Sequence, residues 1–188
     1  MRIISGIFKG KKILQPKDSN TRPLKDLTKE SIFNIIIHSK KFNLNILNSN
    51  ILDLFSGVGS FGIECLSRGA KKVTFIENYV GVLSILKKNL LSLNSIKNYK
   101  IIEKDIYKNK LELDLKDKFD LIFLDPPYKD KNLIELFKKL ENLKILKSNS
   151  IIILHRHKKE KDSFPSSFRI IEEKKYGISK IFFIEYLK

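Results

Sequence analysis

The sequence contains little cysteine: Cys65 is the only one among 188 residues. A single cysteine excludes a disulfide within the chain and a cysteine-based zinc cluster, so a hydrophobic core has to hold the fold together. A domain of this length buries roughly 70% of the surface that its unfolded chain exposes. We therefore expect a self-sufficient core, with Cys65 as a small apolar residue inside a helix.

Long apolar runs are also absent. No stretch approaches the roughly 20 apolar residues that span a bilayer. The first residues, MRIISG, lack the apolar stretch of a signal peptide. We expect no membrane contact and a cytoplasmic location.

Negative charge is scarce relative to positive charge. The chain has 37 Lys and Arg residues against 21 Asp and Glu residues, which gives a net charge of +16. Such an excess attracts a polyanion and speeds encounter with it. Lysine supplies 32 of the 37 cations in a chain rich in Ile and Asn, so we attribute part of the excess to an A/T-rich genome. The imbalance still favours a nucleic-acid partner over an acidic small molecule.

From Ile51 onward, short apolar runs alternate with segments of helical period. We expect strands at 51–55, 73–77, 100–103, 119–124 and 150–154, and helices at 61–68, 80–94 and 131–143. This alternation predicts βαβ units and a mostly parallel sheet. The gap between two final strands, 168–174 and 180–187, is too short for a crossover helix, so these should pair as an antiparallel hairpin. The fold class is therefore α/β and Rossmann-like, with an antiparallel last strand.

Residues 1–50 form a separate unit, which we interpret as an N-terminal extension of a domain over 51–188. A glycine-punctuated segment at 2–14, expected as a hairpin, precedes a polar loop at 15–26. A helix from about 28 to 40 follows, and residues 43–50, rich in Asn, are expected to be a linker. The helix should bury its apolar side chains, which are Ile32, Phe33, Ile36 and Ile37.

A glycine loop, DLFSGVGSFG at 53–62, follows the first strand of the alternating region. Its spacing permits a tight turn and a close approach of the backbone to a ligand, so we expect Phe55, Gly57 and Gly59 to line a cofactor. Glu77 lies 20 residues after Gly57, where a carboxylate can accept hydrogen bonds from an adenosine ribose. These features predict a cofactor that contains adenosine, without saying which one.

Asp53 and the length of the chain favour S-adenosylmethionine over a nicotinamide dinucleotide. A carboxylate at Asp53, directly before the loop, can receive an ammonium group and would repel a pyrophosphate. The chain is too short for a second mononucleotide-binding half and a substrate domain. Asp105, which closes the third strand, is placed to accept a hydrogen bond from an adenine amino group, or it caps a turn.

The tetrapeptide Asp125-Pro126-Pro127-Tyr128 directly follows the apolar strand FDLIFL, at the edge of the sheet where α/β proteins bind ligands. Two prolines fix φ and remove backbone donors, so the turn is rigid and rich in acceptors. The Oδ of Asp125 and the carbonyl of Pro126 can hold the N–H groups of an exocyclic base amine and stabilise positive charge on its nitrogen. Tyr128 can stack on the base. We expect this tetrapeptide to be catalytic, without a metal.

These residues resemble the bacterial small-subunit ribosomal RNA methyltransferase D family, which are guanine-N2 methyltransferases. The glycine loop and the tetrapeptide are shared with many amino-methyltransferases, whereas the N-terminal blocks are more specific to this family. The resemblance covers MRIISGIFKGKKI at 1–13, TRPLKD and KESIFNII within 21–36, LDLFSGVGSFGIECLSRGA at 52–70, Glu77, and FDLIFLDPPY at 119–128.

The resemblance implies a class I methyltransferase fold, S-adenosylmethionine as cofactor and, as substrate, a guanine in a decoding-region hairpin loop of 16S ribosomal RNA. We expect the RNA to be recognised by its shape within a partly or fully assembled small ribosomal subunit. The family pattern puts the cofactor on Asp53, Gly57, Gly59, Glu77 and Asp105, and the target amine on Asp125, Pro126 and Tyr128.

The loop before the first helix adds a candidate RNA contact. Arg22, next to Pro23, offers a planar fork that fits a phosphate or a guanine edge. The family usually has Thr after TRP and a basic residue further on, where this chain has Leu24 and Leu27. These two departures leave open the detail of RNA contact in this segment.

A basic stretch, His155-Arg156-His157-Lys158-Lys159, ends the fifth strand. We expect alternate residues to point in opposite directions and so to separate the two histidines. The stretch is therefore interpreted as a basic rim for RNA phosphate or a solvated strand end, rather than a metal site.

Two other functions stay open on the residues alone. An adenine-N6 or cytosine-N4 DNA methyltransferase requires the same acceptors, but such enzymes usually carry a recognition domain for which this chain has no room. A non-catalytic RNA-binding protein that kept the fold would predict a broken glycine loop or tetrapeptide, and both are intact.

Overall fold

The computed structural model describes residues 1–16 and 24–188, and strands and helices alternate along it. A helix precedes the alternating region, and turns rather than a helix join the third strand to the fourth. The elements are α1 (Asp26–His38), β1 (Asn50–Leu54), α2 (Ser60–Ser67), β2 (Lys72–Ile76), α3 (Val80–Leu91), β3 (Tyr99–Ile102), β4 (Phe119–Leu124), α4 (Leu133–Asn142), β5 (Leu146–His157), β6 (Phe168–Tyr176) and β7 (Ser179–Tyr186).

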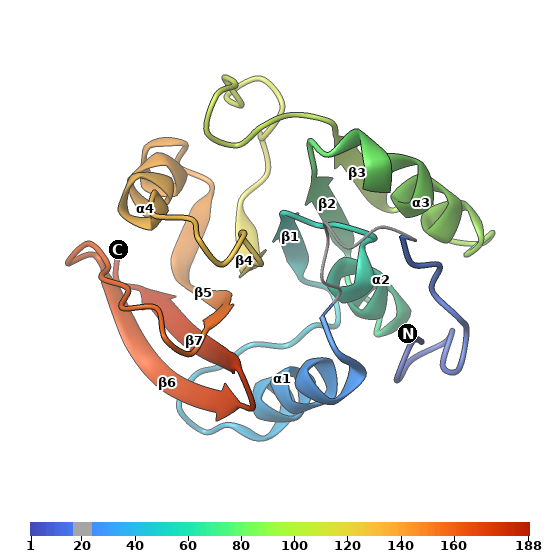
Figure 1. Ribbon diagram of the computed structural model, residues 1–188, viewed down its shortest axis with the longest axis horizontal. Helices are drawn as coiled ribbons and strands as arrows, with labels where there is room; N and C mark the ends of the chain where they lie inside the picture. The colour runs from blue at the N-terminus through green and yellow to red at the C-terminus, as the bar shows by residue number, and fades with distance from the viewer. Residues whose placement is uncertain (17–23) are drawn as a thin grey trace.

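Within the described residues the strands form one seven-stranded sheet, in the order β3-β2-β1-β4-β5-β7-β6 (Figure 1). The strands from β3 to β5 pair in parallel. β7 is antiparallel to both of its neighbours, β5 and β6. The expected α/β, Rossmann-like fold with an antiparallel last strand is therefore confirmed.

The chain order of the strands creates a crevice between β1 and β4. From β1 the chain adds β2 and β3 on one side, and then returns to add β4 and β5 on the other. The crossovers that follow β1 and β4 leave the sheet in opposite directions, and ligands of open α/β sheets bind at such a point. The glycine loop and the Asp-Pro-Pro-Tyr turn leave the sheet on either side of this crevice.

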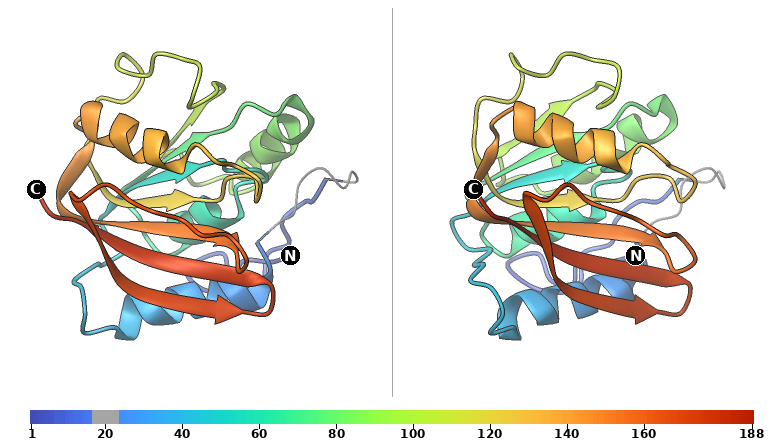
Figure 2. Two further views of the ribbon diagram at one scale, coloured as in Figure 1. Left: turned by 60° about the vertical axis from the view of Figure 1, so that its left-hand side comes forward. Right: turned by 90° about the vertical axis from the view of Figure 1, so that its left-hand side faces the viewer.

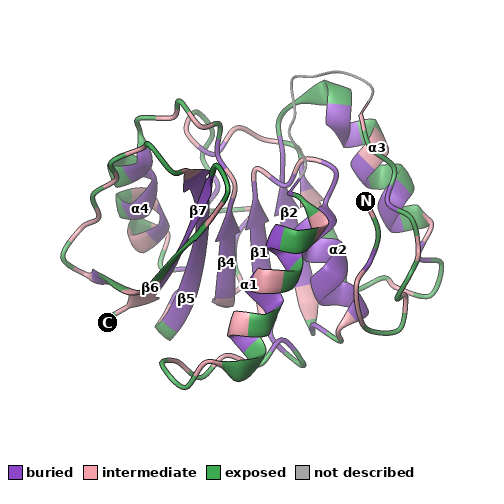
Figure 3. Cartoon of the chain, turned by 60° about the horizontal axis from the view of Figure 1, so that its bottom comes forward, coloured by how far each residue is buried: buried purple, intermediate pink, exposed green. Residues whose placement is uncertain are grey.

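Successive residues of the central strands face two separate cores. Leu121 and Phe123 of β4 pack into the core shared with α1, α2 and α3, whereas Ile122 and Leu124 pack into the core shared with α4. Figure 2 shows α1 and α4 on opposite sides of the sheet. Burial on both faces explains why these strands are apolar at most positions, and Figure 3 shows them buried along most of their length. No helix in the described part of the chain is long and apolar enough to cross a membrane.

The N-terminal residues differ from the expectation in two details. The hairpin expected at 2–14 is reduced to a single antiparallel bridge between Arg2 and Lys12. In α1, Ile32, Phe33 and Ile36 are buried, but Ile37 is 57% exposed. The prediction for Ile37 was wrong because each helical residue turns about 100° from the previous one, which carries Ile37 past the edge of the buried stripe.

The buried side chain of Glu64 in α2 ties the N-terminal segment to the sheet. Its Oε2 accepts a hydrogen bond from the Ile4 amide at 2.7 Å, and its Oε1 accepts one from the Ser5 amide at 2.9 Å. The Nε of Arg68 donates to Oε1 at 2.8 Å. A carboxylate removed from water needs such donors around it, so Glu64 depends on the N-terminal segment being in place.

Lys29 of α1 completes this network and is itself fully buried. Its Nζ donates to the carbonyl of Arg2 at 2.8 Å and lies 3.8 Å from Oε2 of Glu64. Burial lowers the pKa of Lys29, and the negative charge of Glu64 opposes that shift. Lys29 of α1 and Glu64 of α2 thus form a buried ion pair.

We expect Glu64→Ala to lower the free energy of unfolding by about 3–5 kcal/mol, because it leaves Lys29 buried without this counter-charge and two backbone amides unpaired. Lys29→Met should cost less, since Glu64 keeps its three hydrogen-bond donors. Urea unfolding followed by circular dichroism measures both variants. Equal losses in the two variants would contradict the anchoring role of Glu64.

Candidate active site

Three carboxylates meet at the crevice, one from the end of each of three neighbouring strands. Asp53 lies in β1, Glu77 follows β2 and Asp125 follows β4. Burial raises the pKa of Asp53 well above its usual value, and the charges of Asp125 and Glu77 raise it further, whereas a hydrogen bond from the Gly62 amide lowers it. The crevice is therefore a place where a bound cation would be stabilised.

The glycine loop leaves β1 through backbone conformations that favour glycine. Gly57 has φ of 54° and Gly59 has φ of 82°. A Cβ on Gly59 would lie 2.5 Å from Leu86 Cδ1, whereas a Cβ on Gly57 would meet no atom within 4 Å. Gly59 therefore serves close packing against α3, while the backbone at Gly57 borders open space where a ligand can approach.

Phe55, at the start of this loop, has φ of 56°, an uncommon conformation for a residue with a side chain. Such conformations cost of order 1–3 kcal/mol and gather at functional sites. The ring of Phe55 packs against that of Tyr107, with the centroids 6.1 Å apart. Phe55 thus lies beside the loop that follows β3, where the adenine contact was expected.

Glu77 holds the glycine loop in place. Its Oε2 accepts a hydrogen bond from the Gly57 amide at 2.7 Å, and its Oε1 accepts from the amides of Asn78 and Tyr79 at 2.9 and 2.8 Å. A carboxylate offers about four acceptor positions, so roughly one is left for a ligand. Glu77 therefore fixes the loop and can still take a ribose hydroxyl.

Asp105 caps the turn that follows β3. Its Oδ1 accepts hydrogen bonds from the amides of Tyr107 and Lys108 at 2.8 and 3.3 Å. Asp105 therefore caps a turn, which is one of the two roles expected for it. The adenine contact proposed for Asp105 would use its other oxygen.

The acceptors of the Asp-Pro-Pro-Tyr turn differ in whether the protein already binds them. The carbonyl of Pro127 accepts from the Asp130 amide at 2.9 Å and from Nη1 of Arg156 at 3.0 Å. The carbonyl of Pro126 meets no donor among the described residues, and the side chain of Asp125 is 20% exposed. Nδ1 of His155 lies 2.8 Å from Oδ1 of Asp125, so the acceptors that the described residues leave available are Oδ2 of Asp125 and the carbonyl of Pro126.

Arg156 anchors this turn from β5, a contact that the sequence did not suggest. Its side chain is 2% exposed, and its Nη2 donates to the carbonyl of Asp130 at 2.8 Å, while its Nε donates to Asp162 at 3.1 Å. A buried guanidinium needs several acceptors, and here two of them are the carbonyls of Pro127 and Asp130. Arg156 is thus a structural part of the site rather than part of a basic rim.

The two histidines flanking Arg156 lie on the same side, contrary to the expectation. The ring centroid of Tyr128 is 5.7 Å from that of His155 and 5.3 Å from that of His157. Side chains two positions apart on a strand share a face, and it is Arg156 between them that points to the other. Both imidazoles therefore border the ring expected to stack on the base.

The expected RNA contacts before α1 are only partly within the structure. Arg22 and Pro23 lie outside the described residues. Leu24 is buried in the core, whereas Leu27 is 78% exposed on the first turn of α1. The described residues contain no cluster of three or more His, Cys, Asp or Glu side chains that could hold a metal ion.

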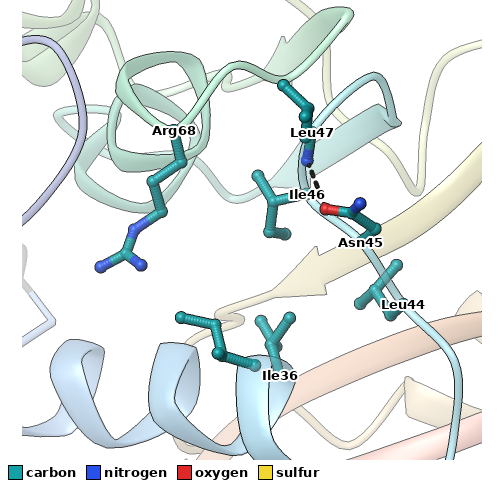
Figure 4. Close-up of a pocket in the computed structure, with 7 residues that line it drawn as sticks. Ile36, Leu44, Asn45, Ile46, Leu47 and Arg68 are labelled. Carbon is teal, nitrogen blue, oxygen red and sulfur yellow. Dashed lines mark hydrogen bonds between the residues drawn. The ribbon is translucent and has the colours of Figure 1, made fainter.

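A hollow of about 290 Å³ lies at the opposite edge of the sheet, beside the segment that precedes β1. Figure 4 shows Ile36 of α1, Leu44 to Leu47 and Arg68 around it. Residues 43–50, expected as a linker, thus pack against α1 and α2. None of the three crevice carboxylates lines this hollow.

The crevice fits S-adenosylmethionine in three respects. The open space at Gly57 admits a ligand close to the backbone. Glu77 offers an acceptor to a ribose, and the buried carboxyl of Asp53, whose pKa is raised by burial, suits an ammonium group that restores its charged form.

Comparisons with known proteins agree with this arrangement. Residues 1–185 match the model of a family described as "Conserved hypothetical protein 95". Ribosomal RNA small subunit methyltransferase D of Haemophilus influenzae is 34% identical over 179 residues, which are 95% of this chain and 90% of that protein. The protein of the same name from Buchnera aphidicola is 35% identical over 172 residues, or 92% of this chain and 86% of that one.

Solved structures also match over the whole length. The Escherichia coli protein yhhF has a TM-score of 0.81 and 26% identity, covering 100% of this chain and 98% of that one. A protein from Haemophilus influenzae has a TM-score of 0.74 and 33% identity, covering 100% of this chain and 99% of that one. The expected resemblance is confirmed, and the chain belongs to the ribosomal RNA small subunit methyltransferase D family.

Proposed function

We propose that the protein transfers a methyl group from S-adenosylmethionine to the exocyclic N2 amine of a guanine in 16S ribosomal RNA. The observation that carries this proposal is the crevice itself, where the unpaired oxygen of Asp125 and the carbonyl of Pro126 lie across from the glycine loop. Membership of the family supports ribosomal RNA as the substrate, in preference to DNA. Such a substrate would place the enzyme in the cytoplasm.

The chemistry follows from what each side chain can hold. When bound, S-adenosylmethionine supplies an electrophilic methyl group on its sulfonium. The amine on a guanine ring is a weak nucleophile because its lone pair is delocalised. Asp125 Oδ and the Pro126 carbonyl would accept its N–H groups, turn the lone pair out of the ring and stabilise the positive charge that develops on nitrogen. As the N–CH3 bond forms, the S–CH3 bond breaks and a neutral thioether leaves, and the methylated amine then releases its proton to water. Fixing the two reactants in line would lower the barrier by several kcal/mol more.

The rigid surroundings of the turn support this role. Arg156 holds the carbonyls of Pro127 and Asp130, so the acceptors of Asp125 and Pro126 stay at fixed positions. The Tyr128 ring, bordered by His155 and His157, would stack on the guanine. A base in a hairpin loop costs only a few kcal/mol to swing into such a pocket.

Exposed lysines near Tyr128 offer a surface for RNA phosphate. Five lysines, which we call the rim lysines, lie in the loops after β4 and β5 and form no side-chain hydrogen bond or ion pair within the described residues: Lys129, Lys131, Lys158, Lys159 and Lys161. The acids beside them are engaged elsewhere, Asp130 by the hydroxyl of Tyr107 and Asp162 by Arg156. The positive charge of the rim is therefore not neutralised locally.

We further propose that the substrate is recognised within a partly or fully assembled small subunit. We divide the residues into an N-terminal extension over 1–50 and a methyltransferase domain over 51–188, and the RNA contacts proposed above lie on the rim of the crevice. Exposed lysines suit contacts to phosphate and to the shape of folded RNA rather than to base edges. Lysines would contact phosphate, with the target loop reaching the crevice.

The test is tritiated methyl transfer from S-adenosylmethionine to small subunits that lack the modification. The modified nucleoside is identified by mass, and naked 16S RNA and a short hairpin with the same loop are assayed in parallel. We expect N2-methylguanine and the highest rate on subunits. A methylated adenine or cytosine would refute the guanine assignment, and an equally good hairpin would refute recognition of the particle.

We expect Asp125→Ala to lower kcat by about 100- to 1,000-fold with little change in the affinity for S-adenosylmethionine, because it removes an acceptor for the amine. Asp125→Asn should lose less, since an amide oxygen still accepts. Steady-state kinetics and titration calorimetry measure the two quantities. Parallel loss of turnover and cofactor affinity in the alanine variant would place Asp125 in the cofactor site instead.

Glu77→Ala should weaken binding of S-adenosylmethionine by about 1.5–3 kcal/mol, because it removes both a ribose acceptor and the anchor of the Gly57 amide. Titration calorimetry gives the dissociation constant. Glu173→Ala, which removes the same charge from an exposed position of β6, is the control. Unchanged affinity in Glu77→Ala would remove this residue from the cofactor site.

Lys158→Gln combined with Lys159→Gln should weaken RNA binding and reduce the slope of log affinity against log salt by about 0.7–0.9 for each lysine that contacts phosphate. The matched control is Lys116→Gln with Lys118→Gln, a pair that is also exposed and lies just before β4, at the opposite edge of the sheet. Filter binding across a salt series provides the slopes. If both double variants changed the slope equally, the lysines would attract RNA through the overall charge of the protein, and Lys158 and Lys159 would have no special role.

A further inference from the structure

We propose that His155 is a positioning residue for the methyl transfer, which holds one oxygen of Asp125 so that the other is free for the target amine. This inference rests on the proposed function and adds a residue to it. Nδ1 of His155 lies 2.8 Å from Oδ1 of Asp125, between two side chains 30 positions apart in the sequence. The two residues come from neighbouring parallel strands, His155 from β5 and Asp125 from just after β4.

The protonation pattern of His155 follows from its two partners. An ionised carboxylate only accepts hydrogen bonds, so Nδ1 of His155 carries the proton toward Asp125. On the other side of the ring, Nε2 lies 2.9 Å from Oγ of Ser179, whose hydroxyl can donate to an unprotonated nitrogen. Ser179 thus favours the tautomer that presents an N–H to Asp125.

Burial makes this contact decisive for the orientation of Asp125. The side chain of His155 is only 6% exposed, so water cannot readily replace it. No other side chain in the described parts of the protein donates a hydrogen bond to the carboxylate of Asp125. Without His155 the carboxylate would be free to rotate, and the acceptor would no longer have a defined position.

The same imidazole also borders the ring of Tyr128. Their planes meet at 80°, in an edge-to-face contact. His155 therefore contacts both the acceptor for the amine and the ring expected to stack on the base, and it joins them through a single rigid group on β5. A positional error of about 1 Å in such a group can cost about 100-fold in rate.

Two substitutions separate the roles of the two ring nitrogens. In His155→Asn the amide nitrogen takes roughly the place of Nδ1 and can donate to Asp125, whereas the contact with Ser179 is lost. In His155→Gln the longer side chain reaches toward Ser179, and the contact with Asp125 is lost. Both variants remove the aromatic ring, so they differ mainly in which hydrogen bond survives.

The measurement is methyl transfer to small subunits lacking the modification, with kcat, the KM for S-adenosylmethionine and thermal unfolding recorded for each variant. We expect His155→Gln to lower kcat by about 100-fold with KM for the cofactor unchanged, and His155→Asn to retain at least about tenfold more activity. In an Asp125→Asn background, His155→Gln should cost less than it does in the unmodified protein, because the two residues act through one contact.

Equal activity of the Asn and Gln variants, or loss of cofactor binding in parallel with kcat, would overturn the inference, since a merely structural histidine predicts those results. Independent, fully additive effects of the changes at 155 and 125 would also overturn it. If the unmodified protein transfers no methyl group to the subunits, the proposed function fails, and this is distinct from an active protein that is indifferent to His155.

Discussion

The convergence of strand ends at a single crevice is the constraint on which the rest of the structure depends. Parallel pairing of β2, β1 and β4 brings their carboxyl ends to the same edge. Asp53, Glu77 and Asp125 lie there together, and the pKa of Asp53 is raised by burial and, to a smaller extent, by the charges of Asp125 and Glu77. The fold tolerates this concentration of charge because backbone amides of the glycine loop and of α2 donate to Glu77 and Asp53.

The fold and the cofactor loop could be predicted from the sequence because their signals are local. Continuous apolar runs identify the strands, and the spacing of Gly57 and Gly59 identifies the turn that needs positive φ. Asp125 to Tyr128 were placed correctly at the edge of the sheet because a turn after a buried strand can only lie there. Each of these inferences uses residues that are close together in the chain.

The buried charged residues that hold the turn and the N-terminal segment in place could not be predicted, because their contacts join residues that are far apart in the sequence. Arg156 was assigned to a basic surface, since a lone arginine in a run of cations is usually solvated. The structure instead turns it inward, where the carbonyls of Pro127 and Asp130 accept from it. Glu64 and Lys29 are a similar case, because the spacing of polar residues in two helices does not reveal that they share a buried network.

The buried position of Arg156 also explains why the surface near the crevice stays basic. Asp162 and Arg156 form an ion pair beneath the rim, and Glu160 lies 3.9 Å from Arg156. The acids of this segment are thus occupied by a buried arginine rather than by surface lysines. A cation placed inside the site therefore has two effects: it fixes the turn that would hold the amine, and it leaves the exposed Lys158 and Lys159 without local counter-charges. In the proposed reaction, attraction of RNA and positioning of the acceptors would thus be linked through Arg156.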